Sequence, residues 1–255
     1  MPRIKRAPKV IPSDPAWEAM KATRRTLSHG EAVRESAFLS ARWRSLWGRR
    51  TTIQVDVREL IQALSAKKIP FVLTGAQAIG GWTGRPRATQ DVNLLVKPGR
   101  NLTRAVKAVR ELYPQLEVRP FAGVWAFFVP GEKDSVIDVT YPHRADLEET
   151  LAHPVWVEDR GLRYRIPALE AALANKYGAM LTPTRNLGKR VNDVADFTNM
   201  VLHSLDEGQQ PIDLQQLAAL GEKVWPGGGG EEILRLVEQV KAGRSFNLED
   251  LLKEP

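Results

Sequence analysis

The stretch that decides the fold is TGAQAIGGWTGRPRATQDVNLLV, residues 74–96. An apolar run, PFVL (70–73), precedes it, and the flanking Pro and Gly are typical of a short buried strand. The segment QDVNLLV (90–96) alternates polar and apolar residues before it becomes fully apolar, which predicts a second strand. We therefore expect a strand, a tight turn into a short helix, and a second strand in this part of the chain.

The sequence on either side predicts an α/β domain over residues 51–142. Apolar residues recur at helical spacing in VDVRELIQALSAKKI (55–69) and NLTRAVKAVRELYPQ (101–115). The segments VWAFFVP (124–130) and SVIDVTYP (135–142) are strand-like and are joined by the turn GEKD, which predicts a hairpin.

The remainder, residues 143–255, is expected to be mainly helical. A short strand pair is expected near 155–157 and 162–166, and the glycine-rich segment PGGGG (226–230) predicts a flexible break. The helices expected in this region span residues 168–181, 188–205, 213–224 and 231–243.

Residues 1–50 are rich in charge and are expected to form a basic, partly disordered arm with helices around 14–26 and 30–47. The chain has a formal net charge of +7, part of which lies in this arm. Two interpretations stay open, a solvated tail and a segment that binds nucleic acid through its phosphates.

Composition excludes several classes of protein. There are no cysteines, so there is no disulfide framework and no thiolate zinc site. The 4 histidines show no metal-ligand spacing. No apolar run reaches the roughly 18 residues of a membrane span, and no apolar stretch follows the basic N-terminus. We expect a cytoplasmic protein with no membrane partner.

Three groups of residues in this domain are suited to phosphate and metal chemistry. Gly75 and Ala76 follow the first strand, where a helix N-terminus can receive phosphate oxygens; a plain tight turn is the alternative. Asp91 and Asn93 share one face of a strand and offer oxygen ligands for a hard cation. Asp138 lies inside an apolar strand, either as a metal ligand or on a solvent-facing surface.

These residues resemble the opening of the nucleotidyltransferase-like superfamily, with its polymerase-beta-type fold, and are most similar to the abortive-infection type nucleotidyltransferase toxins. That pattern has a small-residue turn, then Arg-x-Thr-x-Asp-x-Asp, then a third acid on a later strand. Here the Arg-x-Thr-x-Asp run is Arg87, Thr89 and Asp91. The resemblance continues through residue 202 with Lys176, either Arg185 or Arg190, Asp193 and Asp196 in the same order.

The resemblance implies an α/β (α+β) fold, with a mixed sheet, flanking helices and a C-terminal helical half. It implies Mg²⁺, or Mn²⁺, as cofactor and an NTP as substrate. Asp91, Asn93 and Asp138 would lie at the metal, with Asp138 also the candidate base.

It further implies that Gly75 and Ala76 hold the β- and γ-phosphates and that Lys176 neutralises triphosphate charge. Asp193 or Asp196 would orient that lysine or the nucleotide base, and Arg87 and Thr89 would brace the loop. Surface positions are the alternative for the lysine and the acid pair.

Asn93 departs from the pattern because it replaces the second acid, and a neutral ligand offsets less of the repulsion between two metal ions. Two functions therefore stay open. The first is transfer of an NMP to a hydroxyl of RNA (tRNA included), a protein or a small molecule. The second is a catalytically degenerate module that binds nucleotide or RNA, with an antitoxin-like partner in a toxin–antitoxin or defence pair.

Overall fold

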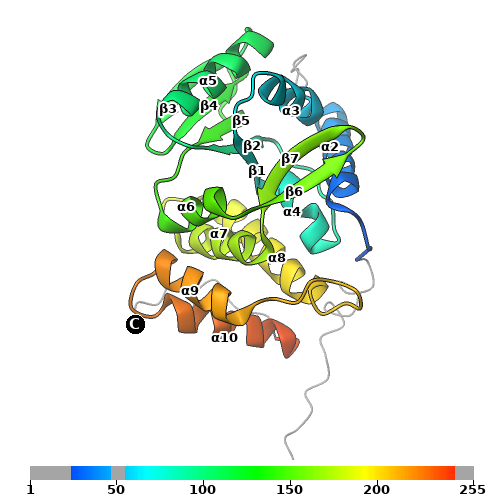
Figure 1. Cartoon of the computed structure of the whole chain (residues 1–255), viewed down its shortest axis with the longest axis vertical. Coiled ribbons are helices and arrows are strands. Elements are labelled where there is room, and N and C mark those ends of the chain that lie inside the picture. The colour runs from blue at the N-terminus through cyan, green and yellow to red at the C-terminus, as the bar shows by residue number, and fades with distance from the viewer. Residues whose placement is uncertain (1–23, 47–54, 245–255) are drawn as a thin grey trace, which may run out of the picture.

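The computed structural model describes residues 24–46 and 55–244, and its sheet-bearing half lies against a helical half (Figure 1). The predicted N-terminal arm lies largely outside the described residues. Of the helix expected around 14–26, residues 24–26 are described and are not helical. The second helix expected in the arm is present as α2 (His29–Leu46).

The central sheet has the strand order β1-β2-β5-β4-β3. Strand β2 runs parallel to β5 and antiparallel to β1, while β4 pairs antiparallel with both β5 and β3. The strands are β1 (Phe71–Thr74), β2 (Val92–Val96), β3 (Glu117–Phe121), β4 (Val124–Phe128) and β5 (Ser135–Thr140). The predicted fold class is confirmed: a mixed sheet with flanking helices precedes a helical half.

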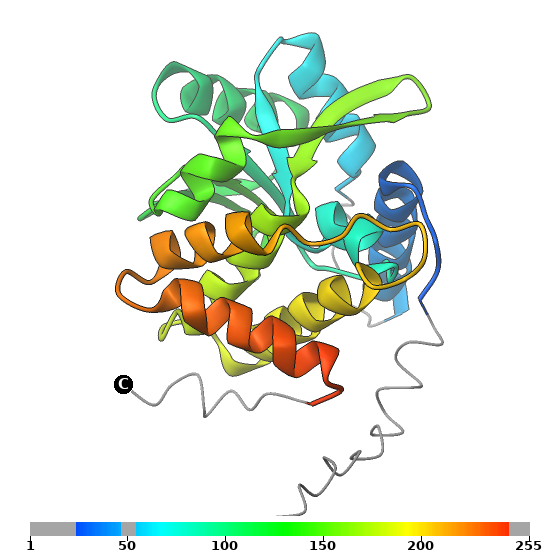
Figure 2. The ribbon, with the colours of Figure 1, turned by 60° about the horizontal axis from the view of Figure 1, so that its bottom comes forward.

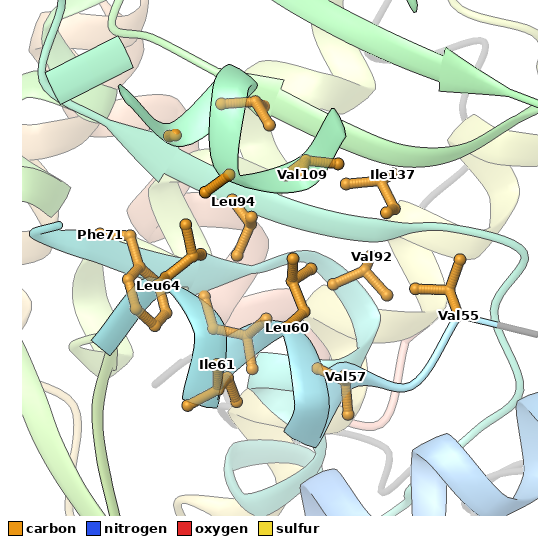
Figure 3. Close-up of a cluster of buried hydrophobic side chains, with 14 of the residues drawn as sticks. Val55, Val57, Leu60, Ile61, Leu64, Phe71, Val92, Leu94, Val109 and Ile137 are labelled. Carbon is orange, nitrogen blue, oxygen red and sulfur yellow. The ribbon is translucent and has the colours of Figure 1, made fainter. Parts of the chain in front are cut away.

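Helices α3 (Val57–Ala66) and α5 (Arg100–Leu112) cover one face of this sheet. Their apolar stripes pack with alternate strand residues, including Val92, Leu94 and Ile137 (Figure 3). Because neighbouring strand residues point to opposite faces, the polar residues next to these three face away from α3 and α5. This core thus fixes which face of the sheet carries the candidate site.

A two-stranded hairpin joins the sheet to the helical half. Strands β6 (Pro154–Asp159) and β7 (Leu162–Pro167) pair with each other, and Arg165 Nε donates to the carbonyl oxygen of Phe71 at 2.9 Å. Buried residues of the hairpin belong to the same core as the sheet.

The helical half forms a second core, shown from below in Figure 2. It draws Ile79 from α4 (Gly75–Thr83) as well as side chains from the later helices. Those helices are α7 (Leu169–Leu181), α8 (Leu187–His203), α9 (Leu214–Val224) and α10 (Gly229–Lys241). The two cores meet near residue 168; a domain boundary at 142 stays a prediction.

Three features differ from the sequence-based expectations. Strand β3 lies at the sheet edge with most of its residues exposed, and its charged residues and Pro120 gave no apolar alternation. The short helix α6 (Ala145–Ala152) was not predicted. The expected flexible break is partly helix, because α10 begins at Gly229 and packs that glycine against the backbone of Gly221.

Candidate active site

The first part of the site is the turn between β1 and α4. Thr74 is extended and Gly75 has a φ of +72°, a conformation that side chains disfavour. A Cβ at Gly75 would also lie 2.7 Å from Nδ2 of Asn93. Glycine is therefore required here both by conformation and by space. Ala76 is buried in the first turn of α4 and offers no hydroxyl to a ligand.

The predicted oxygen ligands do converge on one face of the sheet. Asn93 lies between Thr74 on β1 and Asp138 on β5 in the strand register. Asp91 was expected inside the strand 90–96 but directly precedes β2, which begins at Val92, and it is half-buried like Asn93. All three polar side chains lie on the face opposite α3 and α5, since Val92 and Ile137 occupy the other face.

Asp138 is not on a solvent-facing surface. Its Oδ1 is buried and has no hydrogen-bond partner in the described part of the chain. Burial, together with the nearby charge of Asp91, raises the pKa of Asp138 to about 6, although a hydrogen bond with Ser135 and the charges of Lys189 and Arg185 act in the opposite direction. An unsatisfied carboxylate oxygen beside a second carboxylate is the environment that a bound cation would relieve.

The oxygen donors of this face fit a hard divalent ion such as Mg²⁺ or Mn²⁺. Asp91, Asn93 and Asp138 would hold it. Only two of these three ligands carry charge, and among residues 24–46 and 55–244 no group of three or more His, Cys, Asp or Glu side chains is placed to hold a metal. Two carboxylates and one neutral amide therefore fit one ion better than two.

Hydrogen bonds of Thr89 hold the loop from α4 to β2 on both sides. Thr89 Oγ1 donates to Asp91 Oδ1 at 2.7 Å. The Thr89 backbone N–H donates to Ser40 Oγ of α2 at 2.9 Å. Helix α2 therefore positions Asp91 through Thr89, a contribution that the sequence alone did not predict.

Behind this loop lies a buried ionic network on α7 and α8. Lys176 Nζ lies 2.9 Å from Asp193 Oδ1 and 2.7 Å from Asp196 Oδ2. Arg87 binds both oxygens of Asp196, at 2.9 and 2.8 Å. Arg185 Nε donates to Asp193 Oδ2 at 2.5 Å. None of the three central residues is a surface residue, because Lys176, Asp193 and Asp196 are all buried.

This network fixes the charge of its members. Burial alone would raise the pKa of Asp196, but Lys176 and Arg87 hold that pKa below its usual value. Three cations against two carboxylates leave a net charge of +1 on the network. Of the two arginines proposed for this pattern, Arg185 joins the network. Arg190 instead donates from Nε to the carbonyl oxygen of Met180.

Lys189 was missed by the sequence analysis. It is exposed on α8, and its charge acts on Asp138 together with that of Arg185. A signal for it exists in the sequence, because Lys189 precedes Asp193 by four residues and so shares its helix face. Lys189 on α8 and Arg185 just before this helix thus act electrostatically on Asp138.

Comparisons with known proteins give a limited likeness. No family model and no curated protein matches the chain. It is similar to an antigenic nucleotidyltransferase-like protein from Paracoccidioides brasiliensis, with 17% identity, a TM-score of 0.45, and coverage of 74% of this chain and 92% of that one. It is also similar to the antibiotic-resistance factor ANT(2'')-Ia, with 14% identity, a TM-score of 0.42, and coverage of 64% and 86%. TM-scores this low do not establish a common fold, so neither likeness supports a function for this chain.

Proposed function

We propose that the protein is a nucleotidyltransferase that moves an NMP from a metal-bound NTP to a hydroxyl group. One observation carries this proposal: Asp91, Asn93 and Asp138 lie on one face of the sheet, an oxygen of Asp138 has no hydrogen-bond partner among the described residues, and the charges of Arg185 and Lys189 act on Asp138. A triphosphate suits these residues because its negative charge is attracted both to a cation held by the carboxylates and to the side chains of Arg185 and Lys189.

In the proposed reaction the acceptor oxygen forms a bond to the α-phosphorus, and the bond from that phosphorus to the bridging oxygen breaks, releasing pyrophosphate. When bound, a divalent ion supplies Lewis-acid activation of the phosphoryl group. Asp138 takes the proton of the acceptor hydroxyl, a role suited to a carboxylate whose pKa is raised to about 6. Asp91 is held in place for metal binding by Thr89.

The remaining residues orient the substrate. The backbone N–H groups at Gly75 and Ala76 are placed for the β- and γ-phosphates, because Thr74 supplies no side-chain cap to that helix. We assign the neutralisation of triphosphate charge mainly to the exposed Lys189, because Arg185 is also paired with Asp193. Lys176 already lies against two carboxylates, so its part is to fix α7, α8 and the Arg87 loop.

The second candidate function, a degenerate module that binds nucleotide or RNA, rests on Asn93. A neutral residue at the register position next to Asp138 removes one of the charges that two metal ions require. An antitoxin-like partner belongs to this second function.

Incubation with each of the four α-labelled NTPs, in Mg²⁺ and in Mn²⁺, tests the first proposal. Total RNA and the protein itself serve as acceptors, and Asp91→Ala is the control. Label transfer that disappears in Asp91→Ala supports the transferase. NTP binding without transfer in either metal would favour the binding module, and loss of both would refute the assigned site.

A further inference from the structure

A pocket lies beside the ionic network of Lys176, Asp193 and Asp196, next to the loop formed by residues 84–87. Its volume is about 390 Å³, within the range of small-ligand sites. Its polar walls come from three separate parts of the chain, the segment before α2, the loop after α4, and α8. The side chains that matter here are Arg25, Arg85, Arg87, Asn192, Asp196 and Asn199.

Guanidinium groups predominate among the charged side chains that line this pocket. Arg25, Arg85 and Arg87 line it together with one carboxylate, Asp196, which is shared by Arg87 and Lys176. Arg25 contacts Glu35, and both of these side chains are exposed. Burial lowers the pKa of Arg85, and the neighbouring charge of Arg24 lowers it further. Positive charge gathered in a partly enclosed space favours an anionic ligand.

An independent observation also points to a ligand. Asn199 is only 8% exposed, and it lines the pocket from α8. Its Oδ1 is buried and has no hydrogen-bond partner among the described residues. A buried amide oxygen without a donor is costly, so a ligand with a hydrogen-bond donor would stabilise it. Arginine forks bind phosphate, and Asn199 would accept from a hydroxyl or amino group next to it.

We propose that this pocket binds a phosphate group carried by a nucleotide, either free or within an oligonucleotide, at a site separate from the candidate active site. Arg87 connects the two sites, since it lines the pocket and lies in the same loop as Thr89, which donates to Asp91. Binding at this pocket does not require catalysis, because none of its lining residues is Asp91, Asn93 or Asp138.

Binding is best measured with the Asp91→Ala variant of the 255-residue chain in EDTA, because the variant lacks a proposed metal ligand and EDTA removes divalent ions. The probes are inorganic phosphate, AMP and a short 5′-labelled RNA, each titrated by calorimetry or fluorescence anisotropy. We expect binding of at least one nucleotide probe. Binding of AMP identifies a free nucleotide as sufficient, and binding of RNA alone identifies the polynucleotide as the source.

Two variants and a matched control separate this pocket from general charge effects. Arg25→Gln is compared with Arg119→Gln, because both arginines are exposed and each contacts an exposed glutamate. Arg25→Gln should weaken binding on the order of tenfold, as expected for one charge-assisted hydrogen bond, while Arg119→Gln changes it less than about twofold. Asn199→Asp, which adds an anion to the wall, should weaken binding at least as much.

Absence of binding by all three probes would overturn the proposal, as would binding that Arg25→Gln and Arg119→Gln reduce equally. Because Arg25 is exposed, its replacement leaves the fold intact and the comparison stands even where Asn199→Asp lowers stability. The outcome is independent of the transferase assay: label transfer by the wild-type protein together with no probe binding in EDTA refutes this pocket alone.

Discussion

Asn93 and Asp138 stand opposite each other in the register of the parallel strands β2 and β5. A neutral amide therefore occupies the position next to the most perturbed carboxylate of the sheet, whose pKa is raised to about 6. The amide limits how much negative charge this face can present to a cation, and a carboxylate in its place would add a third half-buried negative charge to the metal-free protein.

Replacing this amide by a carboxylate, Asn93→Asp, should strengthen metal binding. A third carboxylate ligand is expected to raise Mn²⁺ affinity by about tenfold or more, since the added charge acts at short range in a half-buried site. Isothermal titration with Mn²⁺ measures the change. Asn101→Asp, on α5, adds the same charge outside the site and should leave affinity unchanged. Equal Mn²⁺ affinities for Asn93→Asp and the wild type would show that Asn93 is not a metal ligand.

Lys176 and Lys189 should behave differently although both are lysines facing the site from the helical half. Lys176→Met leaves Asp193 and Asp196 with reduced compensation in a buried network, so we expect a loss of about 3–5 kcal/mol in the free energy of unfolding. Lys189→Met changes an exposed residue and should cost less than about 0.5 kcal/mol. Urea unfolding of the two variants measures the difference.

NTP binding should show the opposite order. Lys189→Met is expected to weaken NTP affinity several-fold, because the charge of Lys189 acts on Asp138 in the candidate site. Equilibrium binding of a labelled NTP at constant ionic strength provides the readout. Unchanged NTP affinity in Lys189→Met would contradict the role of Lys189 and favour Lys176 as the residue that neutralises triphosphate charge.

The stability of the metal-free protein should depend on pH through Asp138. Its pKa is 3.8 in the reference state and about 6 in the folded protein, so ionisation disfavours the folded state as the pH rises through this interval. Asp138→Asn should therefore stabilise the protein by about 1–3 kcal/mol near pH 8, and this gain should vanish below about pH 4.

Urea unfolding in EDTA at the two pH values tests this expectation. Glu207→Gln, on an exposed turn, removes the same charge outside the site and serves as control. A gain of equal size at both pH values would show that packing, rather than ionisation of Asp138, causes the difference.

Gly75→Ala should damage both the fold and the site. The left-handed φ and the short distance to Asn93 act together, so we expect a destabilisation of at least about 1–3 kcal/mol and displacement of the Asn93 amide. Gly131→Ala is a suitable control, since it has a similar φ but no neighbour within 4 Å of the added Cβ. Similar losses of stability and of Mn²⁺ affinity in the two variants would argue against the role of the Asn93 contact.

The sequence predicted the elements of the sheet better than the contacts of the site. A continuous apolar run suffices to predict β1, and apolar periodicity suffices for β2, β5 and α5. It fails for β3, an exposed edge strand whose position depends on pairing with β4.

The candidate site shows the same division. The resemblance gave the order of Lys176, Asp193 and Asp196, with Arg185 and Arg190 as alternatives between them. It implied that one of the two acids orients the lysine or the nucleotide base, but not which acid pairs with which cation. Which carboxylate faces Arg87 or Lys176 depends on how α7 and α8 pack against α4 and its loop, and no local pattern records that packing. For the same reason the hydrogen bond from Thr89 to Ser40 of α2, and the role of Lys189, emerged only in three dimensions.

The Arg87–Asp196 pair joins residues that are 109 positions apart in the chain. During synthesis, Asp91 and Asp138 leave the ribosome well before α8 does. A nascent chain that ends at β5 holds these carboxylates but lacks Arg185, Lys189 and the partner of Arg87. The cations of the candidate site therefore join its carboxylates only later in translation, so the two sides of the candidate site arise at different times.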